Sequence, residues 1–207
     1  MRPARLRIAC LHTAASNIAV FDAAAAGMDV RLEHHVRADL LAAAEAAGGL
    51  TEAIRAETRA ALAGLGAQAD VVLLTCSTLG PAADGYALRV DAVLASQVAA
   101  CGGTVVVLCA VQTTLEPTRL LFEAAGAVVD LRLVPGAWDR FKAGDIDGYH
   151  RRIADAADTA FAEGPKVVAL AQASMAGAAA LCTRGTPMTS PQSGLAAAVA
   201  AGAQTDA

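Results

Sequence analysis

The segment Val71–Leu79 reads VVLLTCSTL, and a similar segment, VVALAQASM, occupies Val167–Met175, 96 positions further along the chain. Each copy begins with four apolar residues that include adjacent valines, and it continues with small and polar residues. A short continuous apolar run rich in β-branched residues is typical of a strand buried on both faces of a parallel sheet. The repeat therefore predicts two related strands, and it aligns Cys76 with Gln172.

The elements around the two copies follow the same order. In each half, a helical stretch that follows a glycine precedes the copy, and a further strand lies upstream, at Ile8–His12 and at Val105–Val111. A matched order of elements is the sequence signature of an internal repeat. We therefore expect two similar lobes, one in each half. The small hydroxyl residues that follow the upstream strands are Thr13, Ser16, Thr113 and Thr114.

Short apolar runs alternate with stretches of helical periodicity along the whole chain. Apolar residues recur at helical spacing from Leu50 to Leu65 and from Ile146 to Phe161, and Thr51 and Asp145 can cap these helices. Strands that alternate with helices predict a doubly wound α/β fold, with a largely parallel sheet flanked by helices in each lobe. We expect the first lobe to span residues 1–100, completed by 189–207, and the second to span 101–188. The predicted strands are Leu6–Leu11, Val30–His34, Val71–Thr75, Val105–Cys109, Val128–Val134 and Val167–Leu170.

Composition limits the possible function classes. Of the 207 residues, 56% are hydrophobic and 3% aromatic, and the formal net charge is −4, so we expect no nucleic-acid partner. The longest strongly apolar run, 105–111, is too short for a membrane span of about 20 residues, and the basic start, residues 1–7, lacks the apolar stretch of a secretory signal. The five cysteines form no C-x-x-C pair, which argues against a disulfide framework or a zinc knuckle. We expect a cytoplasmic protein.

Ligands of open α/β sheets bind at the carboxyl ends of the strands. If the two lobes face each other, four segments meet at one crevice, and their backbone N–H groups favour an anion such as a carboxylate. These segments are 12–17, 76–80, 113–118 and 172–175.

Cys76 follows directly on a predicted buried strand. A helix that starts near Thr78 would place N–H groups close to the sulfur and lower the pKa of the thiol, as an acid/base or nucleophilic cysteine requires. A buried and inert cysteine is the alternative interpretation of the same pattern.

The run LTCSTLG, residues 74–80, resembles the first cysteine motif of the aspartate/glutamate/hydantoin racemase superfamily, and AQASMA, residues 171–176, resembles the segment that holds its second cysteine. The resemblance covers nearly the whole chain. It implies two facing cysteines that remove and return a proton at the substrate Cα without metal or other cofactor. It also implies that Cys76 is the first of these cysteines, that Ser77 and Thr78 hold the substrate carboxylate and stabilise the enediolate, and that the protein is a homodimer.

The sequence departs from this pattern at Gln172, which stands at the second cysteine position. An amide has no useful acid or base pKa, and Cys182, ten residues later, is expected inside a helix. Three mechanisms remain open. One is a single-thiol reaction, as in the arylmalonate decarboxylases of the superfamily. Another is covalent attack by Cys76, as in its maleate isomerases, and the last is racemisation with a second base such as His12.

Several polar residues complete the predicted site, each with a structural alternative. A serine, threonine or asparagine before a helix is often only an N-cap, and His12 can be a hydrogen-bonded structural histidine. The sequence thus predicts a cofactor-independent racemase or isomerase that acts on a small anionic substrate. The alternatives are a decarboxylase of malonate-like acids and a catalytically silent binding protein. The further candidate substrate-binding residues are Thr13, Ser16, Asn17, Thr113, Thr114, Gln172 and Ser174.

Overall fold

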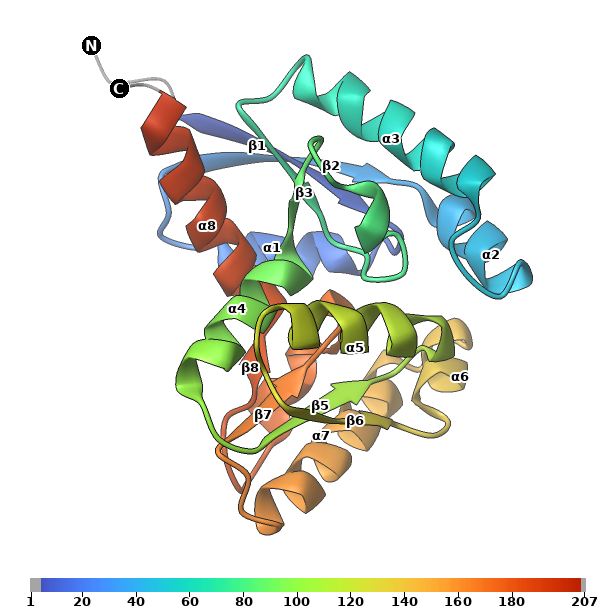
Figure 1. Ribbon diagram of the computed structural model, residues 1–207, viewed down its shortest axis with the longest axis vertical. Helices are drawn as coiled ribbons and strands as arrows, with labels where there is room; N and C mark the ends of the chain where they lie inside the picture. Colours follow the sequence, from blue (N-terminus) through green and yellow to red (C-terminus); the bar gives the residue numbers. More distant parts are fainter. Residues whose placement is uncertain (1–4, 206–207) are drawn as a thin grey trace. The chain divides into compact units, whose positions relative to one another are not determined.

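The computed structural model describes residues 5–205, and the chain divides into two compact units (Figure 1). Unit 1 comprises the chain up to Val90 together with the segment from Pro191, and unit 2 comprises Asp91–Ser190. The division falls after Val90 rather than near residue 100, because Leu94 and Val98 pack in the core of unit 2. Residues 1–4, which begin the segment considered as a secretory signal, and residues 206–207 lie outside the described part.

Unit 1 contains a four-stranded parallel sheet with the strand order β2-β1-β3-β4. The strands are β1 (Leu6–His12), β2 (Val30–Val36), β3 (Val71–Leu74) and β4 (Leu88–Arg89). The helices are α1 (Asn17–Ala24), α2 (Ala38–Ala46), α3 (Glu52–Gly66), the 3-10 turn η1 (Gly80–Ala82) and α8 (Ser190–Thr205), which joins this unit from Pro191 onward.

Unit 2 repeats this arrangement with the strand order β6-β5-β7-β8, again all parallel. The strands are β5 (Val105–Cys109), β6 (Val129–Leu133), β7 (Val167–Leu170) and β8 (Met188–Thr189). The helices are α4 (Val90–Cys101), which joins this unit from Asp91 onward, η2 (Gln112–Thr114), α5 (Leu115–Ala124), α6 (Ala137–Lys142), α7 (Ile146–Ala162) and the 3-10 segment η3 (Ala173–Leu181).

Backbone hydrogen bonds confirm the correspondence between the two halves. The N–H of Thr75 donates to the carbonyl of Leu11 in unit 1 (3.1 Å). At the matching place in unit 2, the N–H of Ala171 donates to the carbonyl of Leu108 (2.9 Å). Cys76 and Gln172, the residues that follow these two donors, therefore occupy equivalent positions in the two units. The predicted α/β fold with two similar lobes is confirmed.

All six predicted strands are present, and two of them, β5 and β7, have the predicted bounds. The caps are confirmed as well. The side chain of Thr51 accepts a hydrogen bond from the N–H of Ile54 (3.4 Å), and that of Asp145 accepts one from Gly148 (2.9 Å). Strands β4 and β8 were not predicted, because two residues are too few to show an apolar period.

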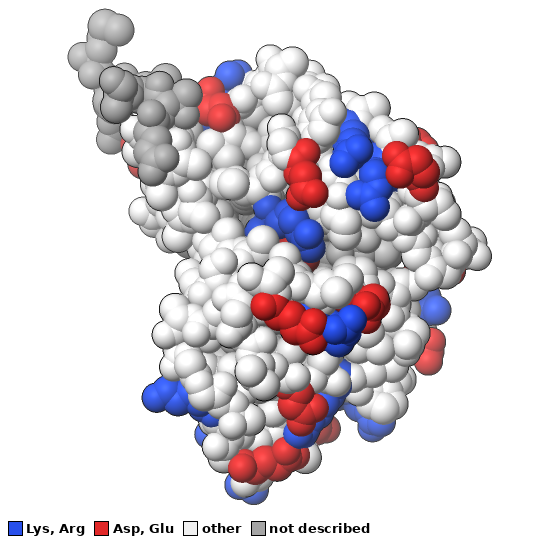
Figure 2. All heavy atoms as spheres, viewed as in Figure 1, with Lys and Arg blue, Asp and Glu red and all other residues white. Residues whose placement is uncertain are grey.

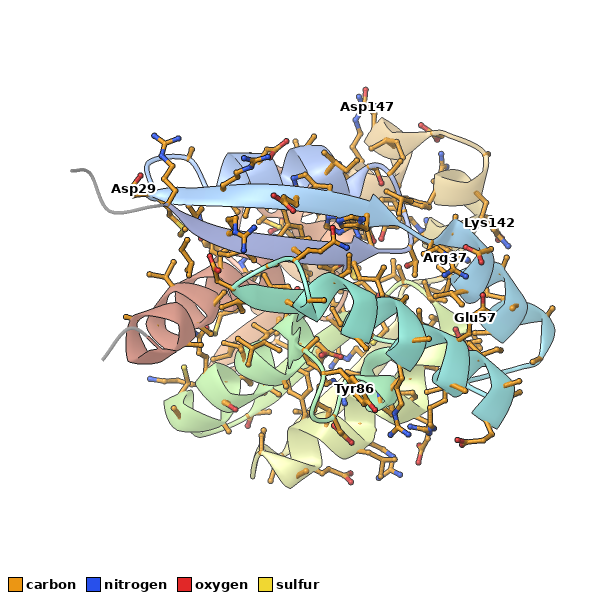
Figure 3. The ribbon with its side chains drawn as sticks, turned by 90° about the horizontal axis from the view of Figure 1, so that it is seen from above. Asp29, Arg37, Glu57, Tyr86, Lys142 and Asp147 are labelled. Atoms are coloured by element: carbon orange, nitrogen blue, oxygen red, sulfur yellow. The ribbon has the colours of Figure 1, made fainter. Side chains whose placement is uncertain are left out.

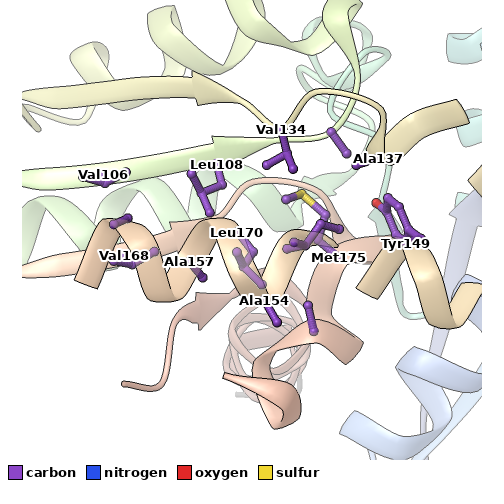
Figure 4. Packing of buried hydrophobic residues seen from close by; sticks show 14 of the residues in the cluster. Val106, Leu108, Val134, Ala137, Tyr149, Ala154, Ala157, Val168, Leu170 and Met175 are labelled. Atoms are coloured by element: carbon purple, nitrogen blue, oxygen red, sulfur yellow. The ribbon is translucent and has the colours of Figure 1, made fainter. Parts of the chain in front are cut away.

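The sheet of unit 2 is buried on both faces. Val106 and Leu108 of β5 point toward α7, where they pack in one cluster with Tyr149 and Ala157 (Figure 4). The alternate residues of the same strand, Val105, Val107 and Cys109, belong to a second cluster with α4 and α5. This two-sided burial explains why the strand reads as an unbroken apolar run rather than as an alternating one.

Charged side chains on the surface occur largely beside charges of opposite sign, as the face in Figure 2 shows. Arg37 is an example, because its guanidinium donates to Asp39 (2.6 Å) and to Glu57 (2.5 Å) across α2 and α3 (Figure 3). Exposed pairs of this kind each contribute little to stability. Within residues 5–205, every helix is too short or too polar to cross a lipid bilayer.

Candidate active site

Cys76 lies at the carboxyl end of β3, in the first turn after the strand. Its side chain is half-buried and packs beside the apolar cluster that contains Leu74 and Leu79. The next two residues, Ser77 and Thr78, are only 4% and 1% exposed. A partly accessible thiol therefore lies among buried hydroxyl groups at the sheet edge where ligands of this fold class bind.

The prediction of a helix that starts near Thr78 is wrong. Residues 77–79 form a turn, and the segment directly after it, η1 (Gly80–Ala82), is a 3-10 turn of only three residues. Pro81 fits the first turn of a helix, but Asp84 and Gly85 then turn the chain, with φ at +76° for the glycine, so no helix continues. Because so short a segment has little macrodipole, a helix dipole cannot be what stabilises a thiolate at Cys76.

A guanidinium group lies against this turn instead. If Gly80 carried a Cβ, that atom would lie 2.6 Å from Cζ and 2.8 Å from Nε of Arg89, so the side chain of Arg89 covers the glycine directly. Arg55 of α3 donates to the carbonyl of Pro81, the middle residue of η1 (2.5 Å). A guanidinium is the group best matched to a carboxylate. Arg89 was not predicted because it lies on the unpredicted strand β4, and its one signal in the sequence is a glycine in the turn that it covers.

His12, the last residue of β1, is fully buried and belongs to a chain of hydrogen bonds. Its Nδ1 lies 2.8 Å from Oγ1 of Thr75, and its Nε2 lies 2.8 Å from Nδ1 of His34. Nε2 of His34 lies 3.1 Å from Oδ1 of Asp22 on α1. Burial, reinforced by the nearby His34, lowers the pKa of His12 to about 4. With both ring nitrogens engaged, the geometry favours the structural interpretation of His12 over the role of second base.

The other predicted residues of unit 1 follow β1. Thr13 and Asn17 are 7% and 5% exposed, whereas Ser16 is exposed and its side chain makes no capping bond to α1. The Oδ1 atom of Asn17 is buried and has no hydrogen-bond partner among the described residues. Because β1 and β3 are adjacent strands, Thr13 and Asn17 share the carboxyl edge of the sheet with Cys76.

In unit 2, the side-chain amide of Gln172 links two segments of the chain by hydrogen bonds, and we call this link the latch. Its Oε1 accepts a hydrogen bond from the N–H of Ala110 (2.6 Å), and its Nε2 donates to Oγ1 of Thr114 (3.0 Å). The hydroxyl of Thr114 in turn donates to the carbonyl of Val111 (2.6 Å). The amide therefore ties the end of β7 to the loop that follows β5, and Thr114 is held in this network rather than capping α5 with its side chain.

Replacing Gln172 with alanine is expected to lower the free energy of unfolding by about 1–3 kcal/mol. The reason is that Ala110, which is 3% exposed, would lose the acceptor of its N–H in a place that water does not reach freely. Urea unfolding measures the change. The matched control is Gln112→Ala, an exposed glutamine of η2, which should change stability by less than about 0.5 kcal/mol. Equal effects of the two substitutions would contradict the latch.

The remaining candidates of unit 2 have packing partners. Ser174 lies in η3, and its Oγ is 2.9 Å from the hydroxyl of Tyr149. Thr113 is half-buried in η2. Cys182 was expected inside a helix, and this is wrong. The segment η3 ends at Leu181, and Cys182 is the extended residue that follows. Burial raises the pKa of the Cys182 thiol, so it is a poor acid or base near neutral pH.

Apart from Ser16, which is exposed, the predicted site residues fall into two groups, each described within its own unit. Thr13, Asn17, Cys76, Ser77 and Thr78 share one sheet edge in unit 1. The second group, at the equivalent edge of unit 2, contains Thr113, Thr114, Gln172 and Ser174.

Comparison with known proteins gives matches among solved structures. No family model and no curated protein matches the chain. An aspartate racemase from Picrophilus torridus superimposes with a TM-score of 0.74 at 12% identity, covering 97% of this chain and 95% of that one. An aspartate racemase homologue from Pyrococcus horikoshii gives 0.65 at 12% identity, covering 95% and 99%. An allantoin racemase from Klebsiella pneumoniae gives 0.61 at 18% identity, covering 97% and 89%. The resemblance inferred from the cysteine motif is thus confirmed in the fold, and the chain has the two-lobe α/β fold of the aspartate and allantoin racemases.

Proposed function

We propose that this protein is a cofactor-independent enzyme of the racemase/isomerase type, in which Cys76 transfers a proton at a carbon next to a carboxylate or carbonyl group. The observation that carries the proposal is the placement of Cys76. It is a half-buried thiol at the carboxyl end of a central strand, followed by the buried hydroxyl residues Ser77 and Thr78. The other cysteines are placed differently: Cys10 and Cys109 are buried in strands, Cys101 lies on the surface of α4, and Cys182, also half-buried, follows η3 rather than a strand.

The residues around Cys76 suit a small anionic substrate. Removing a proton next to a carboxylate creates an enediolate, whose added negative charge must be stabilised by donors fixed in advance. Ser77 and Thr78 can donate hydroxyl hydrogen bonds, and the guanidinium of Arg89, which lies against Gly80, brings a positive charge to the same turn. A carboxylate bound there would present its α-carbon close to a thiol.

Asn17 supports a substrate that also carries an N–H group. Its Oδ1 is a buried acceptor without a partner among residues 5–205, and leaving such an atom unsatisfied costs about 1–3 kcal/mol. An amino acid or a cyclic ureide such as a hydantoin can satisfy it, whereas a simple malonate has no N–H to donate. We therefore place nitrogen-containing substrates ahead of malonate-like acids, and decarboxylation stays the second candidate function.

Of the two equivalent positions, only that of Cys76 carries a thiol, because the other is occupied by Gln172. Its amide cannot donate a proton to a carbanion at a useful rate, and both of its ends are already hydrogen-bonded. We propose that Cys76 both removes and returns the proton, so that isotope exchange at the α-carbon outpaces inversion. By its resemblance to the superfamily, we further propose a cytoplasmic homodimer.

Deuterium incorporation tests this function directly. The protein is incubated in deuterium oxide with a panel of amino acids, hydantoins and malonates, while mass, optical rotation and carbon dioxide are followed together. We expect exchange at the α-carbon of a nitrogen-containing substrate, with slower loss of optical rotation and without carbon dioxide. Release of carbon dioxide would support the lyase instead, and a complete lack of exchange or bond cleavage across the panel would refute the proposal.

A further inference from the structure

We propose that Cys10, His12 and His34 form a binding site for a divalent transition-metal ion of the zinc class, separate from the turn that carries Cys76. One ligand atom from each of the three residues lies within 4.8 Å of the others, so a modest movement closes the set around one ion. The site goes beyond the proposed function and does not depend on it.

Strand geometry explains why these three side chains meet. Cys10 and His12 are two positions apart on β1, so their side chains leave the same face of the sheet. His34 is the residue of β2 that pairs with Cys10 in the parallel register. Ala9 and Leu11, which point to the opposite face, belong to the apolar cluster beside Cys76. The three candidate ligands therefore lie on the other face of β1 from that cluster.

Nε2 of His12 and Nδ1 of His34 face each other, and we call them the inner nitrogens. The outer nitrogens, Nδ1 of His12 and Nε2 of His34, each have a hydrogen-bond partner, as is usual for metal-binding histidines. Nδ1 of His12 lies 2.8 Å from Thr75 Oγ1, whose hydroxyl donates to the carbonyl of Leu11 (3.1 Å). Nε2 of His34 lies 3.1 Å from the carboxylate of Asp22. If both outer nitrogens carry the hydrogen, both inner nitrogens turn a lone pair toward each other and toward Cys10. Partners of this kind fix the tautomer and the ring orientation of metal-binding histidines.

The donor set selects the class of ion. One thiolate and two imidazoles suit Zn²⁺, which accepts three protein ligands and leaves a fourth position for water or another group. A neutral imidazole binds a metal ion through a ring nitrogen without losing a proton. The thiol of Cys10 must lose one, so the balanced step is Cys10–SH plus Zn²⁺ giving a Cys10–S–Zn bond and one proton released to solvent. The two inner nitrogens, now 2.8 Å apart, must separate slightly to surround the ion.

Metal titration of the full chain tests the site. Protein stripped with a chelator is titrated with Zn²⁺ in competition with a chromophoric chelator, and with Co²⁺ to detect thiolate-to-metal charge transfer. We expect one ion per chain, a cobalt spectrum with a thiolate band, and a rise in the unfolding temperature with Zn²⁺. We expect Cys10→Ala and His34→Gln each to weaken Zn²⁺ binding by about 100-fold or more, and Asp22→Asn, at an exposed side chain, to weaken it by about 10-fold to 100-fold.

The neighbouring histidine supplies the matched control. His35 follows His34 on β2 and points to the other face, so His35→Gln should leave the affinity unchanged, as should Cys101→Ser at an exposed thiol. Absence of stoichiometric binding, a cobalt spectrum without the thiolate band, or equal effects of His34→Gln and His35→Gln would each overturn the site and leave only a hydrogen-bonded histidine pair. These metal-binding results do not depend on the Cys76-dependent deuterium exchange at the substrate α-carbon, so either proposal can fail while the other holds.

Discussion

Replacing Cys76 with alanine is expected to lower kcat/KM for the substrate by about 10³-fold, because the substitution removes the only proposed acid/base group at the reacting carbon. The same factor should apply to deuterium exchange, since exchange and turnover use the same proton. The loss should appear mainly in kcat, because the substitution leaves Arg89, Ser77 and Thr78, the proposed carboxylate ligands, in place. Steady-state kinetics and exchange rates on the identified substrate measure both quantities. Thermal unfolding should change little, because a methyl group keeps most of the packing of a half-buried thiol.

Cys182 offers a matched control for this substitution. It is also a half-buried cysteine, but it lies after η3 in unit 2 and donates to the carbonyl of Ala178 (3.3 Å). Cys182→Ala should leave kcat/KM within about twofold of the parent protein, well below the change expected at a reacting group. If Cys76→Ala retains a third or more of the parent activity, or if Cys182→Ala loses as much as Cys76→Ala does, then Cys76 is not the acid/base group.

Replacing Tyr149 with alanine is expected to lower the free energy of unfolding by about 3–5 kcal/mol, the usual cost of deleting a large buried aromatic side chain. Tyr149 is fully buried in unit 2, and its ring meets that of Phe141 edge-on, with the centroids 5.1 Å apart. Its hydroxyl lies 2.9 Å from Oγ of Ser174, so the residue also fixes the start of η3 beside Gln172. Urea unfolding followed by circular dichroism measures the loss.

The variant Tyr149→Phe separates the ring from the hydroxyl. It keeps the packing and loses one hydrogen bond, so it should cost only about 0.5–1.5 kcal/mol. A loss in Tyr149→Phe as large as that in Tyr149→Ala would show that the hydroxyl rather than the ring stabilises this core, contrary to the packing argument.

The sequence predicted the central strands well because burial on both faces leaves a strong signal. Val105–Cys109 and Val167–Leu170 are unbroken apolar runs, and both were predicted with the bounds that the structure has. Turns are decided by fewer residues. The helix expected after Thr78 fails at Asp84 and Gly85, where the chain turns, and the composition of the segment does not reveal this.

Site residues that directly follow a predicted strand could be predicted from the sequence. Contacts that depend on how two neighbouring strands pair could not. Cys76 and Gln172 could be placed from the repeat alone. The contact between Arg89 and Gly80 depends on a two-residue strand that pairs beside β3, and the meeting of Cys10 with His34 depends on which residues of β1 and β2 stand opposite each other. Neither pairing leaves a pattern in the order of residues.

The correspondence between Cys76 and Gln172 has a stereochemical consequence. Interconversion of mirror-image molecules is a reaction whose forward and reverse directions are equivalent, and a protein with matching acid/base groups in its two halves suits it. Here the halves match in strand order but differ at these equivalent positions, where unit 1 has a thiol and unit 2 has an amide that is hydrogen-bonded to Ala110 and Thr114. Such a protein treats the left-handed and right-handed forms of its substrate unequally. If the proposed chemistry holds, exchange of the α-proton should be faster for the enantiomer whose α-hydrogen faces Cys76 than for its mirror image.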